Sequence, residues 1–167
     1  MPGSSFDELH DEPLFMAVSN SDPEMQAAYQ LAANTIAHFK ILINRDSDYI
    51  CCAKLRFRDP DLSEQLGEDR FCFMWLSNVF FHEEENLFLG TFFEVPQEFT
   101  KWHQVGQRLA FEADDIFDWM VQDEGRIHGA FTMRVARQKL KESERESYDR
   151  FVGAEVWEAL PCLDTYC

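Results

Sequence analysis

Acidic side chains gather around a tryptophan in the second half of the chain. Asp114, Asp115 and Asp118 lie close together, and Trp119 follows directly. Hard divalent cations require several carboxylate oxygens, so a cation site is one interpretation, although the alternating acids of a calcium loop are missing. The favoured interpretation is an acidic corner in which Asp118 pairs with Arg134 or Asp115 caps the local backbone, because a buried carboxylate needs a partner. No metal site is therefore predicted.

Two further groups of reactive side chains have simpler explanations. The acids at 83–85 follow His82 at a predicted hairpin tip, where charged side chains keep a turn in water. Cys51 and Cys52 lie on a predicted strand whose alternation places Cys51 inside and Cys52 outside. A thiol nucleophile needs an adjacent base such as a histidine, and the sequence places none beside them.

Sequence motifs that bind phosphate, nucleotide or zinc are missing from the chain. There is no Walker loop, no nucleophile elbow, no Gly-rich dinucleotide turn and no zinc-ligand spacing. The sequence therefore predicts no catalytic residue and no cofactor.

Composition describes a folded and strongly acidic protein. The 167 residues are 46% hydrophobic and include 16 Phe and 4 Trp, which favours one domain with a real core. A formal net charge of -16 repels nucleic acid and anionic membranes, so neither is a predicted partner. No apolar run is long enough to span a bilayer, and the N-terminus does not read as a signal peptide. With five Cys, an odd count, we predict reduced thiols and a cytoplasmic location.

The order of the elements predicts an α+β fold. An apolar face repeats at helical spacing from Pro23 to about Leu42, after a strong Ser-Asp-Pro-Glu start. Strands are predicted over 51–58, 71–76, 79–82, 87–93 and 108–113, with a polar acidic loop over 59–69. A C-terminal helix follows from Ala130. We expect this helix and the N-terminal helix to pack on a bent antiparallel sheet of about five or six strands.

Three segments are predicted along the chain. Residues 1–20 read as a loose acidic arm, in which Leu14, Phe15, Met16 and Val18 are an expected edge strand. Residues 21–152 form the α+β domain. Residues 153–167 are a C-terminal extension whose Val156, Trp157 and Leu160 can dock on the body.

A pattern of spaced residues between Asp114 and Arg137 resembles the YegJ-like family of bacterial proteins of unknown function. The matching residues are Asp115, Ile116, Asp118, Trp119, Met120, Gly125, Gly129, Thr132, Arg134 and Val135. Upstream matches extend the resemblance to roughly residues 22–152. Gly125, Gly129, Thr132 and Arg134 are expected to be structural. The resemblance implies no reaction and no cofactor.

The leading functional hypothesis is a non-enzymatic binding protein. In its specific form, the acidic surface covers the basic active site of a toxin or nuclease, as an inhibitor or immunity protein does, and charge speeds association. The predicted contacts are Asp114, Asp115, Asp118, Trp119, Glu83, Glu84 and Glu85.

Two other readings remain open. The first is a small-ligand or enzymatic domain, with Asp118 and Arg134 as a polar pair in an open pocket and His128 as an acid-base group. The second is a homodimer formed through exposed aromatic side chains of consecutive strand residues. The residues expected there are Phe80, Phe81, Phe92 and Phe93.

Overall fold

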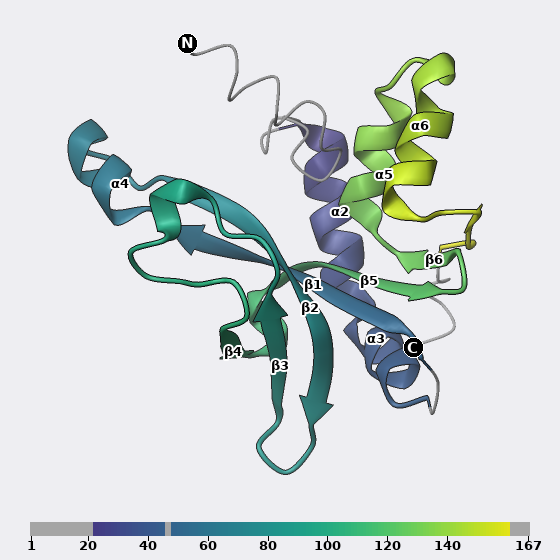
Figure 1. The fold of residues 1–167 in the computed structure, drawn as a ribbon, viewed down its shortest axis with the longest axis horizontal. Helices are drawn as coiled ribbons and strands as arrows, with labels where there is room; N and C mark the ends of the chain where they lie inside the picture. Colours follow the sequence, from purple (N-terminus) through teal and green to yellow (C-terminus); the bar gives the residue numbers. More distant parts are fainter. Residues whose placement is uncertain (1–21, 46–47, 161–167) are drawn as a thin grey trace.

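The computed structural model describes residues 22–45 and 48–160, and it contains a seven-stranded sheet with helices packed around it (Figure 1). The order across the sheet is β4-β3-β2-β1-β5-β6-β7. The strands are β1 (Ile50–Arg58), β2 (Phe71–His82), β3 (Leu87–Phe92), β4 (Arg108–Phe111), β5 (Ile116–Asp123), β6 (Arg126–Gly129) and β7 (Val156–Trp157). The predicted arm at 1–20, with its edge strand, lies outside the described residues.

The α+β class is confirmed, and the sheet is larger than the five or six strands predicted. Neighbouring strands are antiparallel except for β7, which pairs with β6 in parallel. The sequence gives β7 no strand pattern of its own. Its place depends on backbone pairing with β6, where Glu158 N–H donates to the Ile127 carbonyl at 2.9 Å.

Five α-helices and two short 3-10 turns occur in the described part of the chain. They are α2 (Pro23–Asn34), α3 (Ile36–Ile43), α4 (Pro60–Leu66), α5 (Phe131–Gln138), α6 (Glu142–Val152), η2 (Gln97–Phe99) and η3 (Ala113–Asp115). Helix α2 begins as the sequence predicts, because the Asp22 side chain accepts a hydrogen bond from Glu24 N–H at 2.8 Å and Pro23 takes the first turn. Figure 1 shows α2 and α5 side by side.

The predicted N-terminal helix is interrupted at Thr35. The buried Thr35 hydroxyl donates to the Leu31 carbonyl at 2.7 Å and accepts from the Trp119 indole N–H at 3.0 Å. The apolar spacing continues through this point, so it predicts one helix. The interruption comes from a tertiary contact to β5, which spacing cannot reveal.

Two other predictions of local structure need correction. The predicted loop over 59–69 contains α4, which Asp59 caps by accepting from Leu62 N–H at 2.9 Å. The strands predicted at 71–76 and 79–82 are one strand, β2, with an irregular register between Ser77 and Phe80. Asn78 absorbs that irregularity with a left-handed φ of 51°.

Apolar side chains cover the sheet on both faces at β1. The larger cluster includes stacked aromatic rings, with Phe39 lying 5.1 Å from Trp119 and 5.8 Å from Phe88 between ring centres. Cys51 belongs to this cluster. Cys52 belongs to a second cluster that contains Met133 of α5. Adjacent strand residues point to opposite faces, so the prediction that Cys52 faces water is wrong.

Candidate functional site

The Asp118 carboxylate lies at the centre of a buried corner between β5 and α5. It is fully buried and accepts four hydrogen bonds. Backbone N–H groups of Trp119 and Phe131 donate to Oδ1 at 2.8 and 3.0 Å. Thr132 donates to Oδ2 through its backbone N–H at 2.8 Å and through its hydroxyl. Asp118 therefore caps α5 from a distant strand.

Local backbone geometry explains why α5 needs this distant cap. Gly129 and Ala130 both adopt left-handed φ angles, of 71° and 53°, as the chain turns from β6 into α5. Ala130 occupies the N-cap position and has no side-chain oxygen. The first turn of a helix leaves N–H groups without partners and carries a partial positive charge. The Asp118 carboxylate supplies both the acceptors and the negative charge.

Lys54 is the positive side chain that joins the hydrogen-bond network of this corner, through the Thr132 hydroxyl. Its Nζ lies 3.4 Å from the Thr132 hydroxyl and 5.0 Å from the centre of the Phe73 ring. Burial raises the pKa of the Asp118 carboxyl, while the Thr132 hydrogen bonds and Lys54 act in the opposite direction. Burial likewise lowers the pKa of Lys54, and Asp118 opposes that shift.

The predicted pairing of Asp118 with Arg134 is wrong. Arg134 donates instead to two backbone carbonyls, from Nε to Gly129 at 2.8 Å and from Nη2 to Ile127 at 3.2 Å. The physical reason is that Trp119 N–H and the first turn of α5 already saturate the carboxylate. Arg134, further along the same helix, reaches toward the strands beneath it.

His128 does not join Asp118 and Arg134 in one site. Burial lowers its pKa, and nearby charged side chains modify that shift. These side chains are Glu158, Asp123, Arg45 and Arg126. Asp118 is sealed in the corner by α5, so the predicted open pocket with a polar pair and an acid-base group is not formed.

The predicted acidic contact residues divide into exposed and buried sets. Asp118 and Trp119 have no exposed surface, so a partner cannot touch them in this structure. The exposed set consists of Asp114, Asp115, Glu83, Glu84 and Glu85. Asp115 also accepts from Glu112 N–H at 2.8 Å. Within residues 22–45 and 48–160, no group of three or more His, Cys, Asp or Glu side chains is arranged to hold a metal ion.

Of the expected structural residues, Gly129 and Thr132 lie at the corner, and Gly125 lies in the turn between β5 and β6. Gly129 packs on Trp119, and a Cβ added there would lie 2.5 Å from the Trp119 carbonyl oxygen. Gly125 has a left-handed φ of 86°, and its carbonyl accepts from the N–H groups of Glu155 and Val156. Together with Thr132 and Arg134, these residues join β5, β6, α5 and β7.

The two adjacent cysteines have little nucleophilic character. Burial raises the pKa of Cys51 to about 11 and that of Cys52 to about 12. The thiolate is the reactive form of cysteine, so both thiols stay protonated near neutral pH.

The phenylalanines proposed for a homodimer lie in different environments. Phe92 is fully buried, whereas Phe80 is 41% exposed. Phe81 and Phe93 are half-buried against the first and second clusters. Phe92 cannot contribute to a dimer surface, and dimerisation through the others stays a prediction.

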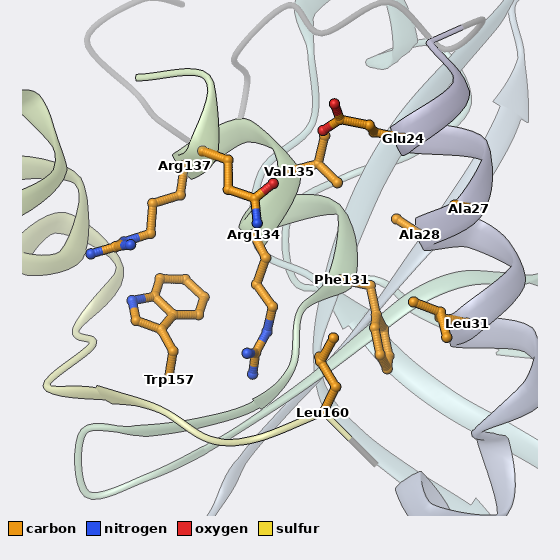
Figure 2. A pocket seen from close by; sticks show the side chains of 11 residues that line it. Glu24, Ala27, Ala28, Leu31, Phe131, Arg134, Val135, Arg137, Trp157 and Leu160 are labelled. Atoms are coloured by element: carbon orange, nitrogen blue, oxygen red, sulfur yellow. The ribbon is translucent and has the colours of Figure 1, made fainter. Parts of the chain in front are cut away.

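A groove between α2 and α5 was not predicted as a site. Its volume is about 510 Å³ (Figure 2). It is lined by Glu24, Ala27, Ala28, Leu31, Phe131, Arg134, Val135, Arg137, Gln138, Trp157 and Leu160. The sequence signal was the pair Arg134 and Arg137, which share a helix face at a spacing of three. Sequence reasoning missed that Trp157 lies between this face and α6.

Comparison with known proteins places the chain in a family. A family described as uncharacterized proteins conserved in bacteria (DUF2314) matches residues 22–156. The match covers most of the chain, which therefore belongs to this family of unknown function. The expected bacterial family of unknown function is thus supported, and the YegJ-like name is not confirmed by it.

One curated relative comes from Neisseria meningitidis serogroup B and is provisionally named as an ankyrin repeat protein. It is 33% identical over 94 residues, which cover 54% of this chain and 36% of the relative. The chain thus spans about a third of the length of that relative. No solved structure matches the chain. Among the described residues, no helix is long and apolar enough to cross a membrane.

Proposed function

We propose that the chain is a non-catalytic binding domain whose exposed acids contact a basic protein. The observation that carries the proposal is the placement of Asp114, Asp115, Glu83, Glu84 and Glu85, all exposed and all outside the salt bridges between described residues. Asp115 also accepts from Glu112 N–H, and the other four carboxylates are free to meet a partner's cations. The net charge of -16 adds long-range attraction to such a partner.

Catalysis receives less support from the geometry. The Asp118 carboxylate is occupied as a helix cap, and Cys51 and Cys52 are buried thiols. The charges that act on His128 come from other residues than these three. The name of the Neisseria relative gives no alternative. Ankyrin repeats consist of paired helices, whereas the fold of this chain is built on a seven-stranded sheet.

The most specific form of the proposal is an inhibitor that covers the basic active site of a toxin or nuclease. Exposed charges act mainly on association rate and on salt dependence. Screening shortens the reach of a charge from about 10 Å at 0.1 M salt to about 3 Å at 1 M salt. Binding to the partner should therefore weaken steeply as salt rises.

A charge-reversal experiment tests this proposal. Proteins from a bacterial host lysate are captured on the immobilised chain at low salt, eluted by a salt gradient and identified by mass spectrometry. Changing Glu83, Glu84 and Glu85 to Lys should remove the salt-sensitive partner. A matched control changes the exposed Glu142, Glu146 and Glu155 of the α6 region to Lys, with the same change in net charge.

Equal retention by both triple variants would overturn the proposed contact surface. A captured partner without excess Lys and Arg would overturn the charge argument. If a purified basic partner is a nuclease, the wild-type chain should inhibit it. The Glu83, Glu84 and Glu85 variant should inhibit it about 10-fold less, since each rim charge contributes modestly.

A further inference from the structure

Arg134 is a half-buried cation that faces the α2–α5 groove with donors to spare. Its guanidinium carries more N–H groups than the two carbonyls of Gly129 and Ile127 accept. No carboxylate of the described residues forms a salt bridge with it. Burial lowers the pKa of Arg134, while the charges of Asp118 and Glu158 act in the opposite direction without forming a salt bridge to it.

Arg137, one turn further along α5, shows the opposite arrangement. Its guanidinium donates to both carboxylate oxygens of Asp149, at 2.6 and 2.8 Å. Both arginines lie near the Trp157 ring, at 5.5 Å for Arg134 and 5.8 Å for Arg137. In Figure 2 the Arg137 side chain is directed away from the groove, whereas Arg134 extends between Trp157 and Leu160. Arg134 is thus the arginine with capacity for a ligand.

The rest of the groove is suited to an apolar body. Phe131, Leu31 and Leu160 line it from three different segments, and Trp157 adds an aromatic wall. Small-molecule sites are mostly apolar concavities of about 300–1,000 Å³ with a few polar groups that fix orientation. The groove, at about 510 Å³, has this size and composition. Glu24 lies at the other end of the groove from the Arg134 guanidinium in Figure 2. Its carboxylate disfavours a ligand that carries a second negative charge at that end.

From these features we infer that the groove binds a small organic monoanion, a carboxylate attached to an aromatic or aliphatic body. The carboxylate accepts hydrogen bonds from the free N–H groups of Arg134, and the body packs on Trp157, Phe131 and Leu31. The site is independent of the acidic surface proposed to contact a basic protein, because the two involve different elements and opposite charges.

A matched pair of probes tests the charge requirement on the full chain. 1-Naphthylacetate and its neutral amide have nearly the same shape, and calorimetry gives their affinities. We expect the carboxylate to bind about 10-fold tighter than the amide, the effect of one charge-assisted hydrogen-bond pair. The indole N–H resonance of Trp157, assigned with Trp157→Phe, should shift on titration with the carboxylate.

Three variants locate the binding. Arg134→Gln should bring the affinities of the two probes to within about 2-fold of each other. Arg150→Gln removes the same charge from an exposed residue outside the groove and should leave the ratio unchanged. Ala27→Leu narrows the groove from α2 without touching Arg134 and should weaken both probes. The Ala27 variant decides the location if Arg134→Gln fails to fold.

Several outcomes would overturn the inference. Equal affinity of the carboxylate and the amide for the wild-type chain would remove the role of the charge. Binding that leaves the Trp157 resonance unchanged would place the ligand elsewhere. Without probe, a Trp157 shift that depends on protein concentration would make a second copy the occupant. Nuclear Overhauser contacts between the groove and residues outside 22–160 would make the chain itself the occupant.

Discussion

Two charged groups near helix α5 lie in contrasting settings: the Asp118 carboxylate of β5, which caps the start of the helix, and the Arg134 guanidinium in its middle. Asp118 is fully buried and accepts four hydrogen bonds from adjoining protein groups. Arg134 is half-buried, donates to two carbonyls and faces a groove. A buried charge whose hydrogen bonds are all made within the protein holds the fold together and leaves nothing for a ligand to satisfy. A charge with spare donors beside a cavity is available for recognition.

This contrast makes the effect on stability larger for Asp118 than for Arg134. Replacing Asp118 with Ala leaves the N–H groups of Phe131 and Thr132 buried without acceptors. Loss of one partner in a buried charged network costs about 3–5 kcal/mol. Replacing Arg134 with Gln should cost only about 1 kcal/mol, because the Ile127 carbonyl still accepts from Glu158 N–H and no buried charge loses its partner.

Urea denaturation followed by circular dichroism measures both changes in the free energy of unfolding. Asp118→Asn serves as the control, since it keeps one acceptor oxygen and should give a loss between those of the other two variants. Equal losses for Asp118→Ala and Arg134→Gln would show that the charge in the corner supports the fold no more than the charge at the groove.

Backbone packing gives the next largest expected effect. Gly129 and Gly67 have similar left-handed φ angles, 71° and 68°, but an added Cβ meets Trp119 at Gly129 and open space at Gly67. Gly67→Ala should cost about 1 kcal/mol, from the φ angle alone. Gly129→Ala should cost about 2–4 kcal/mol, because overpacking adds to that strain.

Thermal unfolding of the two glycine variants provides the measurement. The difference between them isolates the contact with Trp119, since the backbone penalty is shared. If Gly129→Ala and Gly67→Ala unfolded at the same temperature, the close approach to Trp119 would not constrain the corner.

The sequence predicted the positions of helices and strands better than the contacts between their side chains. The start of α2 followed from Asp22 and Pro23, whose effects are local. The same local signal was present at Asp59 and Pro60, where α4 was overlooked in favour of an acidic loop. Asp118 was expected to pair with Arg134, since opposite charges attract. The actual donors are backbone N–H groups, which every residue has and which spacing cannot select.

The groove was harder to predict because its walls come from distant segments. Arg134 was noted as part of a polar pair, and Trp157 as a side chain that docks on the body. Their meeting requires β7 to pair with β6 in parallel, through contacts such as Val156 N–H to the Gly125 carbonyl at 3.0 Å. Such pairing depends on backbone geometry, so the sequence showed the components of the groove without their arrangement.

His103 sharpens the contrast at a third place and has the smallest expected effect. Its ring stacks on Phe92 at 4.7 Å between ring centres and packs edge-on against Phe57 at 5.2 Å. Its Nδ1 is buried and has no hydrogen-bond partner among the described residues. His103 does not line the α2–α5 groove, and its unsatisfied Nδ1 costs stability.

Burial lowers the pKa of His103 in the folded state below its ordinary value. At a pH well above about 6.5 the ring is neutral in both the folded and unfolded states and does not change stability. As the pH falls below that value, the unfolded state binds the proton first, so stability decreases until the folded pKa is also passed.

Urea denaturation from pH 7.5 to pH 5 should show this decrease. His103→Gln should reduce the slope. A slope that is the same in the wild-type protein and in His103→Gln would assign the pH dependence to His38 and His128, whose pKa values burial also lowers.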